Sequence, residues 1–200
     1  MLHAIELSAV AVCAVSGVLE AGRKEIDLLG VVVVALVAAL GGGTLRDLLL
    51  GVPVFWIADQ TYLYAAVAAG IIAFFAARVV RLPRDLFVVP DAAGLALFAV
   101  LGTQKALALG APWLAASLMG VITGVFGGVM RDVLCNEAPL IFTGELYATA
   151  AWAGALLLVL LAYLDVDASF ASLAAIVLIF SVRVAALRWK IGLPRFSSKA

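Results

Sequence analysis

Seven long apolar runs constrain this chain more than any other feature of its sequence. A helix needs about 20 mostly apolar residues to cross a bilayer. The runs cover about residues 3–20, 28–50, 61–78, 91–109, 114–135, 145–164 and 169–187. Apolar residues make up 66% of the chain, well above the roughly 45–50% of soluble domains. We therefore predict an all-α membrane protein with seven transmembrane helices, forming a single transmembrane domain over residues 1–200.

The basic residues predict how these helices cross the membrane, because Lys and Arg of short loops stay on the cytoplasmic side. They gather after the first, third and seventh runs, as Arg23, Lys24, Arg81, Arg84, Arg188, Lys190, Arg195 and Lys199. With seven spans these three segments share one side. We therefore predict an N-terminus outside, a C-terminus in the cytoplasm and a multi-pass protein of the inner (cytoplasmic) membrane.

Glycines and charges interrupt two of the apolar runs in the same order. The second run contains GGGTLRD at residues 41–47, and the fifth contains GGVMRD at residues 127–132. A glycine weakens a helix by about 1 kcal/mol relative to alanine, and a charge inside a bilayer costs about 2.5–3.5 kcal/mol on insertion scales. A chain with no use for these residues would avoid both, so we interpret the two motifs as functional.

The two motifs belong to a longer repeat with a spacing of 85 residues. The same spacing relates Glu6 to Asp91, Gly17 to Gly102, Glu20 to Lys105, Gly42 to Gly127 and Gly43 to Gly128. We predict a first repeat over about 3–80, a second over about 88–165 and an added helix over about 169–187. Because three spans are an odd number, the second repeat enters from the opposite face, as in transporters with inverted-topology repeats.

Inversion sorts the charges inside the apolar runs into two layers. We expect an outer layer of Glu6, Arg46, Asp47 and Lys105 and an inner layer of Glu20, Asp91, Arg131 and Asp132. Such residues normally face a bundle interior or a water-filled cavity. The glycines lie between the layers, near the midplane of the membrane.

The glycines predict a path between the two layers. If they let the second and fifth helices bend or unwind, freed backbone carbonyls can line a cavity. Hydroxyl oxygens of Thr44 and Thr123 lie close by and can replace part of a cation's hydration shell. The Arg-Asp pairs would then brace each bend.

A purely structural interpretation stays open for each of these features. Glycines also serve close helix packing, and Gly120-x-x-x-Gly124-x-x-x-Gly128 fits that use. The Arg-Asp pairs can be simple ion pairs at helix ends, and Lys105 can reach the outer interface with its long side chain. Glu145 is interpreted as a solvated turn residue.

Other classes of function find little support in the sequence. The formal net charge is zero, whereas a nucleic-acid-binding surface is basic. His3 is the lone histidine, so no cluster of metal ligands and no nucleophile beside a base can be recognised. We predict neither an enzyme nor a protein with a cofactor or a resident metal.

Taken together, the motifs resemble the bacterial branch of the trimeric intracellular cation channel family. The resemblance rests on GGGTLRD at 41–47 with Pro53 and Trp56, DAAGLALF at 91–98, GTQK at 102–105 and GGVMRD at 127–132. It implies a homotrimer in which each protomer has a potassium-permeable pore. The pore is lined by the first, second, fourth and fifth spans and bent at Gly41–Gly43 and Gly127–Gly128.

The resemblance leaves two functions to separate. Lys105 lies on the fourth span, where animal members of the family carry basic residues linked to voltage response. Bacterial members also carry a glycine-transporter domain. We therefore expect a cation channel, with potassium ions and membrane lipid as partners, and keep a small amino-acid (glycine) transporter with alternating access as the alternative.

Overall fold

A computed structural model describes residues 2–24, 26–79, 87–143 and 145–194, and this part of the chain is helical without a β-strand. The long helices are α1 (Leu2–Ala21), α2 (Leu28–Leu49), α4 (Thr61–Val79), α5 (Val88–Ala108), α6 (Trp113–Leu134), α7 (Ala148–Tyr163) and α8 (Ala168–Trp189). Short turns of helix, η1 (Gly22–Lys24), α3 (Phe55–Ala58) and η2 (Leu140–Phe142), lie between them. The all-α prediction is confirmed, and the long helices lie where the apolar runs placed them.

The helices differ in how well they suit a bilayer. Within the described residues, α1, α2, α4, α6 and α8 are long and apolar enough to cross a membrane. Helix α7 is apolar but has only 16 residues, fewer than the roughly 20 that a span needs. Helix α5 carries Asp91, Gln104 and Lys105. The count of seven spans therefore stays a prediction.

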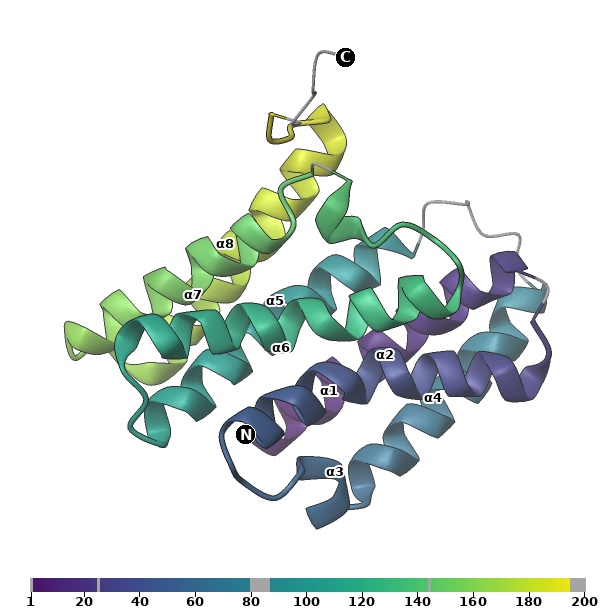
Figure 1. Ribbon diagram of the computed structural model, residues 1–200, viewed down its shortest axis with the longest axis horizontal. Coiled ribbons are helices and arrows are strands. Elements are labelled where there is room, and N and C mark those ends of the chain that lie inside the picture. The colour runs from purple at the N-terminus through teal and green to yellow at the C-terminus, as the bar shows by residue number, and fades with distance from the viewer. Residues whose placement is uncertain (1, 25, 80–86, 144, 195–200) are drawn as a thin grey trace, which may run out of the picture.

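Four helices form the centre of the molecule. Helix α1 packs against α2, α2 against α6, α6 against α5 and α5 against α1, which closes a ring (Figure 1). Helix α4 covers α1 and α2 on one side, whereas α7 and α8 cover α5 and α6 on the other. Large apolar side chains such as Leu29, Ile72, Phe170 and Leu173 are exposed on the outside, as suits contact with lipid.

The glycines of α2 and α6 lie where these two helices cross. A Cβ added at Gly42 would be 2.0 Å from the Thr123 carbonyl oxygen, and one added at Gly127 would be 2.3 Å from that of Ala38. The later residue of α2, Gly42, thus faces the earlier residue of α6, Thr123, and the earlier residue of α2, Ala38, faces the later Gly127. The two helices therefore run antiparallel. Only residues without a side chain allow so close an approach.

This crossing corrects one prediction from the sequence. Both α2 and α6 are helical at every residue, the glycines included, so neither helix unwinds and no backbone carbonyl is freed. The helical hydrogen bonds persist because packing across the crossing offsets the low helix propensity of glycine. A bend without unwinding stays a prediction.

Part of the basis for the predicted orientation falls outside the described residues. Arg81, Arg84, Arg195 and Lys199 lie there, whereas Arg23, Lys24, Arg188 and Lys190 lie at the ends of described helices. The placement of the N-terminus outside therefore stays a prediction.

Candidate functional site

The first group of charges joins α2 to α5, and we call the buried Arg46 and Asp47 with the half-buried Lys105 the Arg46 cluster. The Asp47 Oδ1 atom accepts from Arg46 Nε at 2.7 Å and lies 2.8 Å from Lys105 Nζ. Its Oδ2 atom accepts from the backbone N–H of Phe55 at 2.9 Å. One fully buried carboxylate thus holds two cations and the chain that follows α2.

The second group of buried charges joins α5 to α6, and we call Arg131, Asp132 and Asp91 the Arg131 cluster. Arg131 Nε donates to Asp132 Oδ1 at 2.8 Å, and Arg131 Nη1 donates to Asp91 Oδ1 at 2.5 Å. Arg131 Nη1 also donates to Ser16 Oγ of α1 at 2.6 Å, and Tyr147 donates its hydroxyl to Asp91 Oδ1 at 3.3 Å. Here one buried guanidinium holds two carboxylates.

The two clusters share a scaffold at the 85-residue spacing. Asp132 Oδ2 accepts from the backbone N–H of Leu140 at 3.1 Å, as Asp47 accepts from Phe55. Tyr62 donates its hydroxyl to Glu6, as Tyr147 donates to Asp91. The same local contacts therefore recur in both halves of the chain.

Two of the eight predicted charges lie apart from the clusters. Glu6 bonds Tyr62, whose hydroxyl is also 3.0 Å from His3 Nδ1. Glu20 is buried and pairs with Arg23 at 3.0 Å. The side chain of Lys105 is 31% exposed, and its Nζ atom lies 2.8 Å from Asp47 Oδ1.

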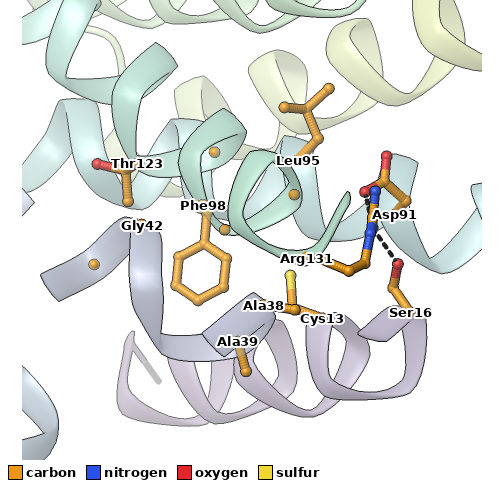
Figure 2. A pocket seen from close by; sticks show the side chains of 14 residues that line it. Cys13, Ser16, Ala38, Ala39, Gly42, Asp91, Leu95, Phe98, Thr123 and Arg131 are labelled. Atoms are coloured by element: carbon orange, nitrogen blue, oxygen red, sulfur yellow. Dashed lines mark hydrogen bonds and ion pairs between the residues drawn. The ribbon is translucent and has the colours of Figure 1, made fainter. Parts of the chain in front are cut away.

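A small cavity lies inside the ring of α1, α2, α5 and α6. Its volume is about 10 Å³, which is room for about one water molecule. It is lined by Cys13, Ser16, Ala38, Ala39, Gly42, Gly43, Asp91, Leu95, Phe98, Thr123, Gly124, Gly127, Gly128 and Arg131. Figure 2 shows Arg131 at one end, between Asp91 and Ser16, with Thr123 beside Gly42 at the other.

Some of the predicted pore residues line this cavity, and the others lie on the face of α2 that points away from it. Gly42, Gly43, Thr123, Gly127 and Gly128 line the cavity. The other two, Gly41 and Thr44, line an apolar groove of about 410 Å³. Residues three apart share one face of a helix, and this pair lies on the face that points away from the ring. The Thr44 hydroxyl accepts from Trp56 Nε1 at 2.9 Å and donates to the Leu40 carbonyl at 2.7 Å.

Sequence reasoning missed Ser16, Tyr147 and Arg183. A signal existed for Tyr147, because the 85-residue spacing pairs it with Tyr62. A signal also existed for Arg183, which is a charge within the seventh apolar run. Ser16 carried none, since a serine in an apolar helix is common. Glu145, interpreted as a solvated turn residue, instead lies 2.7 Å from Arg183.

An ion pair outside the helices ties η1 to the loop after α6. Lys24 Nζ lies 2.6 Å from Glu137 Oε1. This contact lowers the pKa of Glu137 below its ordinary value, chiefly through the hydrogen bond from Lys24. In the loop before α4, the pKa of Asp59 is also lowered, mainly by the hydrogen bond from the Thr61 backbone N–H.

The fold and the site define a class before any comparison: a multi-pass helical membrane protein with charged clusters buried on both sides of a helix crossing. A sequence model of the family described as "Glycine transporter" matches residues 3–78 and again residues 88–163. The chain belongs to this family. The second matched segment begins 85 residues after the first.

The relatives of this chain are membrane proteins. The UPF0126 inner membrane protein YadS of Escherichia coli strain K12 is 41% identical over 98% of this chain and 97% of its own length. A UPF0126 membrane protein of Vibrio cholerae is 41% identical over 98% of this chain and 83% of its own length. The predicted location in the inner membrane is confirmed.

Solved structures confirm the resemblance to the trimeric intracellular cation (TRIC) channel family. The TRIC channel orthologue of Rhodobacter sphaeroides has a TM-score of 0.91 and 38% identity, over 95% of this chain and 98% of that chain. A prokaryotic TRIC channel crystallised in 0.5 M KCl has a TM-score of 0.87 and 30% identity, over 96% and 98%.

Proposed function

We propose that this protein is a monovalent cation channel, permeable to potassium, with one pore in each protomer between α1, α2, α5 and α6. The buried clusters on either side of the Gly42–Gly127 crossing carry this proposal. Charges inside a membrane protein normally face the bundle interior or a water-filled cavity, and Asp91 and Arg131 line a narrow cavity inside the helix ring. The similar solved structures are those of cation channels.

The cavity suggests how a cation would pass. It has room for about one water molecule, and a bare potassium ion is of similar size. A potassium ion at this point therefore sheds most of its hydration shell, and polar oxygens must replace it. The Asp91 carboxylate and the Ser16 and Thr123 hydroxyls are the side-chain oxygens at the cavity.

We further propose seven spans arranged as an inverted 3+3 repeat with α8 added, an N-terminus outside and a homotrimeric assembly in membrane lipid. The antiparallel crossing of α2 and α6 supports the inversion, as does the double match of the family model. The name of the TRIC family supports the trimer. The basic ends of α1 and α8 support the orientation.

Recording from a planar bilayer tests the channel directly. Purified protein should give unitary, ohmic potassium currents. Saturable glycine uptake into vesicles without unitary currents would instead establish the alternative, a glycine transporter with alternating access, which the description of the family favours. The charged groups at the cavity would then hold the carboxylate and ammonium of the amino acid.

Silver ions test where the pore runs, because soft thiolate ligands bind soft monovalent cations. Cys13 lines the cavity, whereas the buried Cys135 does not. Micromolar Ag⁺ should block the potassium current, and Cys13→Ala should abolish this block. Cys135→Ala is the matched control and should leave the block intact. Block that survives Cys13→Ala would place the pore elsewhere.

Ion selectivity tests the role of the Arg131 cluster. Asp91 lines the cavity, but Asp132 does not. Asp91→Asn should therefore reduce the preference for potassium over chloride, measured as a reversal potential, more than Asp132→Asn does. Both variants must first be shown to assemble. Unchanged selectivity in Asp91→Asn would contradict a pore at this cluster.

A further inference from the structure

Arg183 is a buried charge on α8, the helix that lies outside both repeats. Its side chain is 0% exposed. It forms an ion pair with Glu145, with 2.7 Å between Arg183 Nη1 and Glu145 Oε2. None of the three guanidinium nitrogens has a well-directed hydrogen bond to another described residue. Desolvating a guanidinium is costly, and one partly exposed carboxylate does not fully offset that cost, so its position calls for an explanation.

The guanidinium of Arg183 lies over the aromatic ring of Tyr147, with 4.8 Å between Cζ and the ring centroid. The hydroxyl of Tyr147 in turn bonds Asp91 of the Arg131 cluster. The absence of a side chain at Gly128 leaves room for this hydroxyl, since a Cβ there would be 2.8 Å from it. A continuous chain of contacts thus leads from α8 to the cavity.

The first repeat provides a comparison without this arginine. Tyr62 is the counterpart of Tyr147 and bonds Glu6, the counterpart of Asp91. The ring of Tyr62 packs edge-on against Phe55 and His3. Among the described residues, no arginine or lysine stacks on Tyr62 as Arg183 stacks on Tyr147. Of the two tyrosines, only Tyr147, which bonds the cavity-lining Asp91, is thus in contact with a stacked arginine.

An ion pair for stability alone does not account for Arg183 well. Replacing a buried ion pair with apolar residues of similar volume is often neutral or stabilising, so apolar residues could join α8 to the loop at Glu145 equally well. A cation over a desolvated ring, in contrast, fixes the ring's position. Resting on the channel function proposed above, we propose that Arg183 is a positioning residue: it holds Tyr147 against Asp91 and so keeps that carboxylate available to a cation in the cavity.

Single-channel recording of a double-mutant cycle tests this proposal. Tyr147 and Arg131 both bond the Oδ1 atom of Asp91, which leaves the Oδ2 atom without a hydrogen bond among the described residues. Without the hydroxyl of Tyr147, the carboxylate can rotate and offer Oδ2 to Arg131 as well, and the potassium conductance falls. Tyr147→Phe and Arg183→Gln should each lower the unitary conductance by about threefold or more, a size typical of coupled neighbours. The double variant should show no further loss. Arg183→Lys keeps a cation over the ring and should restore most of the conductance.

Tyr62→Phe supplies the matched control. Its effect should multiply with that of Arg183→Gln, because Arg183 does not touch Tyr62. Multiplying effects for Arg183→Gln and Tyr147→Phe would overturn the proposal, as would a normal conductance in Arg183→Gln. If Arg183→Gln fails to assemble, Glu145→Gln with Arg183→Met removes the pair without leaving a lone buried charge, and the same conductance loss is expected.

Thermal unfolding in detergent separates this proposal from the channel function. If the wild-type protein assembles but carries no current, the proposed channel function is wrong. The melting temperatures of the same single and double variants then test the positioning role by itself. Positioning predicts non-additive shifts for Arg183→Gln with Tyr147→Phe and additive shifts for Arg183→Gln with Tyr62→Phe. Additive shifts in both pairs would overturn the positioning role.

Discussion

The Arg46 and Arg131 clusters have one scaffold and opposite charge balance. In each, an aspartate at the end of a central helix bonds the preceding arginine and a backbone N–H eight residues further on. The third member differs, because Lys105 completes the first cluster and Asp91 the second. One cluster therefore has two cations to one carboxylate, and the other has one cation to two carboxylates.

This difference shows which part of the repeat is structural and which part is free to change. The Arg-Asp pair and its bond to the following loop close the end of α2 and α6 in the same way, so both halves keep them. The third partner comes from α5 in both clusters. The counterpart of Lys105 in α1 is Glu20, and that of Asp91 is Glu6. Only the Glu20–Lys105 position changes sign, so the Arg46 cluster has an excess of cationic groups and the Arg131 cluster an excess of carboxylates.

Replacing the aspartate of each cluster should give the largest difference in stability between the two clusters. Asp47→Asn leaves both Arg46 and Lys105 without their carboxylate and should lower the free energy of unfolding by about 3–5 kcal/mol, as when one partner of a buried pair is removed. In Asp132→Asn, Arg131 keeps Asp91, so the loss should be smaller. Unfolding of each variant in mixed detergent micelles measures the difference, and equal losses would contradict the assigned partners.

The sequence predicted local features of these clusters well and distant ones poorly. Apolar length alone located the helices, and adjacency in the chain made the pairing of Arg46 with Asp47 foreseeable. The contact between Lys105 and Asp47 depends on how α5 packs against α2, and the sequence predicted only that they share a layer. The prediction that the helices unwind at the glycines was wrong, because the close packing of α2 against α6 that glycine permits offsets the low helix propensity of glycine.

The sequence did not predict how α2 is rotated about its axis, and for this reason only some of the predicted pore residues line the cavity. Gly42 and Thr44 are neighbours in the sequence, yet they lie on different faces of α2. An apolar helix that packs on several sides has no polar face to reveal its orientation. Arg183 was missed for a different reason, since the 85-residue repeat directed attention to the repeated charges and α8 has no counterpart.

The glycine crossing should give the next largest effect. Gly42→Ala and Gly127→Ala each place a Cβ within 2.3 Å of a backbone carbonyl oxygen, and overpacking of this kind typically costs about 1–3 kcal/mol. Gly41→Ala is the matched control, because its nearest neighbour would be the Gly127 Cα atom at 3.8 Å. The control should be neutral or slightly stabilising, since alanine favours a helix.

Melting temperatures in detergent, with size-exclusion chromatography to follow assembly, measure these three variants. The symmetry of the crossing predicts similar losses for Gly42→Ala and Gly127→Ala. A stable Gly42→Ala protein beside an unstable Gly127→Ala protein would show that the two sides of the crossing are not equivalent.

The residues just after α2 and α6 allow a smaller test. Gly51 and Asn136 are counterparts with left-handed backbones, at φ of 67° and 52°. A Cβ at Gly51 would meet no atom within 4 Å, so the cost of Gly51→Ala is conformational, at about 1–2 kcal/mol. Gly51→Asn and Asn136→Gly should change the melting temperature much less, because asparagine and glycine tolerate this conformation. A large loss in Gly51→Asn would mean that the turns differ.

The smallest effect should come from the Lys24–Glu137 ion pair, which only one end of the molecule has. The counterparts of these residues are Leu109 and Val52, which are apolar and cannot form such a pair. Because the folded-state pKa of Glu137 is lowered, the pair stabilises the protein above the unfolded pKa of about 4.3. This contribution disappears as the pH falls through the folded-state pKa.

Glu137→Gln should therefore lower the melting temperature slightly at pH 7 and leave it unchanged near pH 3, relative to the wild-type protein. The effect is small because both side chains are about one-third or more exposed, and exposed ion pairs contribute little. Asp59→Asn is the control at the other end, made in a His3→Gln background because His3 Nε2 lies 3.9 Å from Asp59 Oδ2. In that background the Asp59 carboxylate keeps its bonds to Thr61 within its own turn, so adding 0.5 M salt should reduce the effect of Glu137→Gln more than that of Asp59→Asn. Equal salt dependence would show that the Lys24 contact contributes no electrostatic stabilisation.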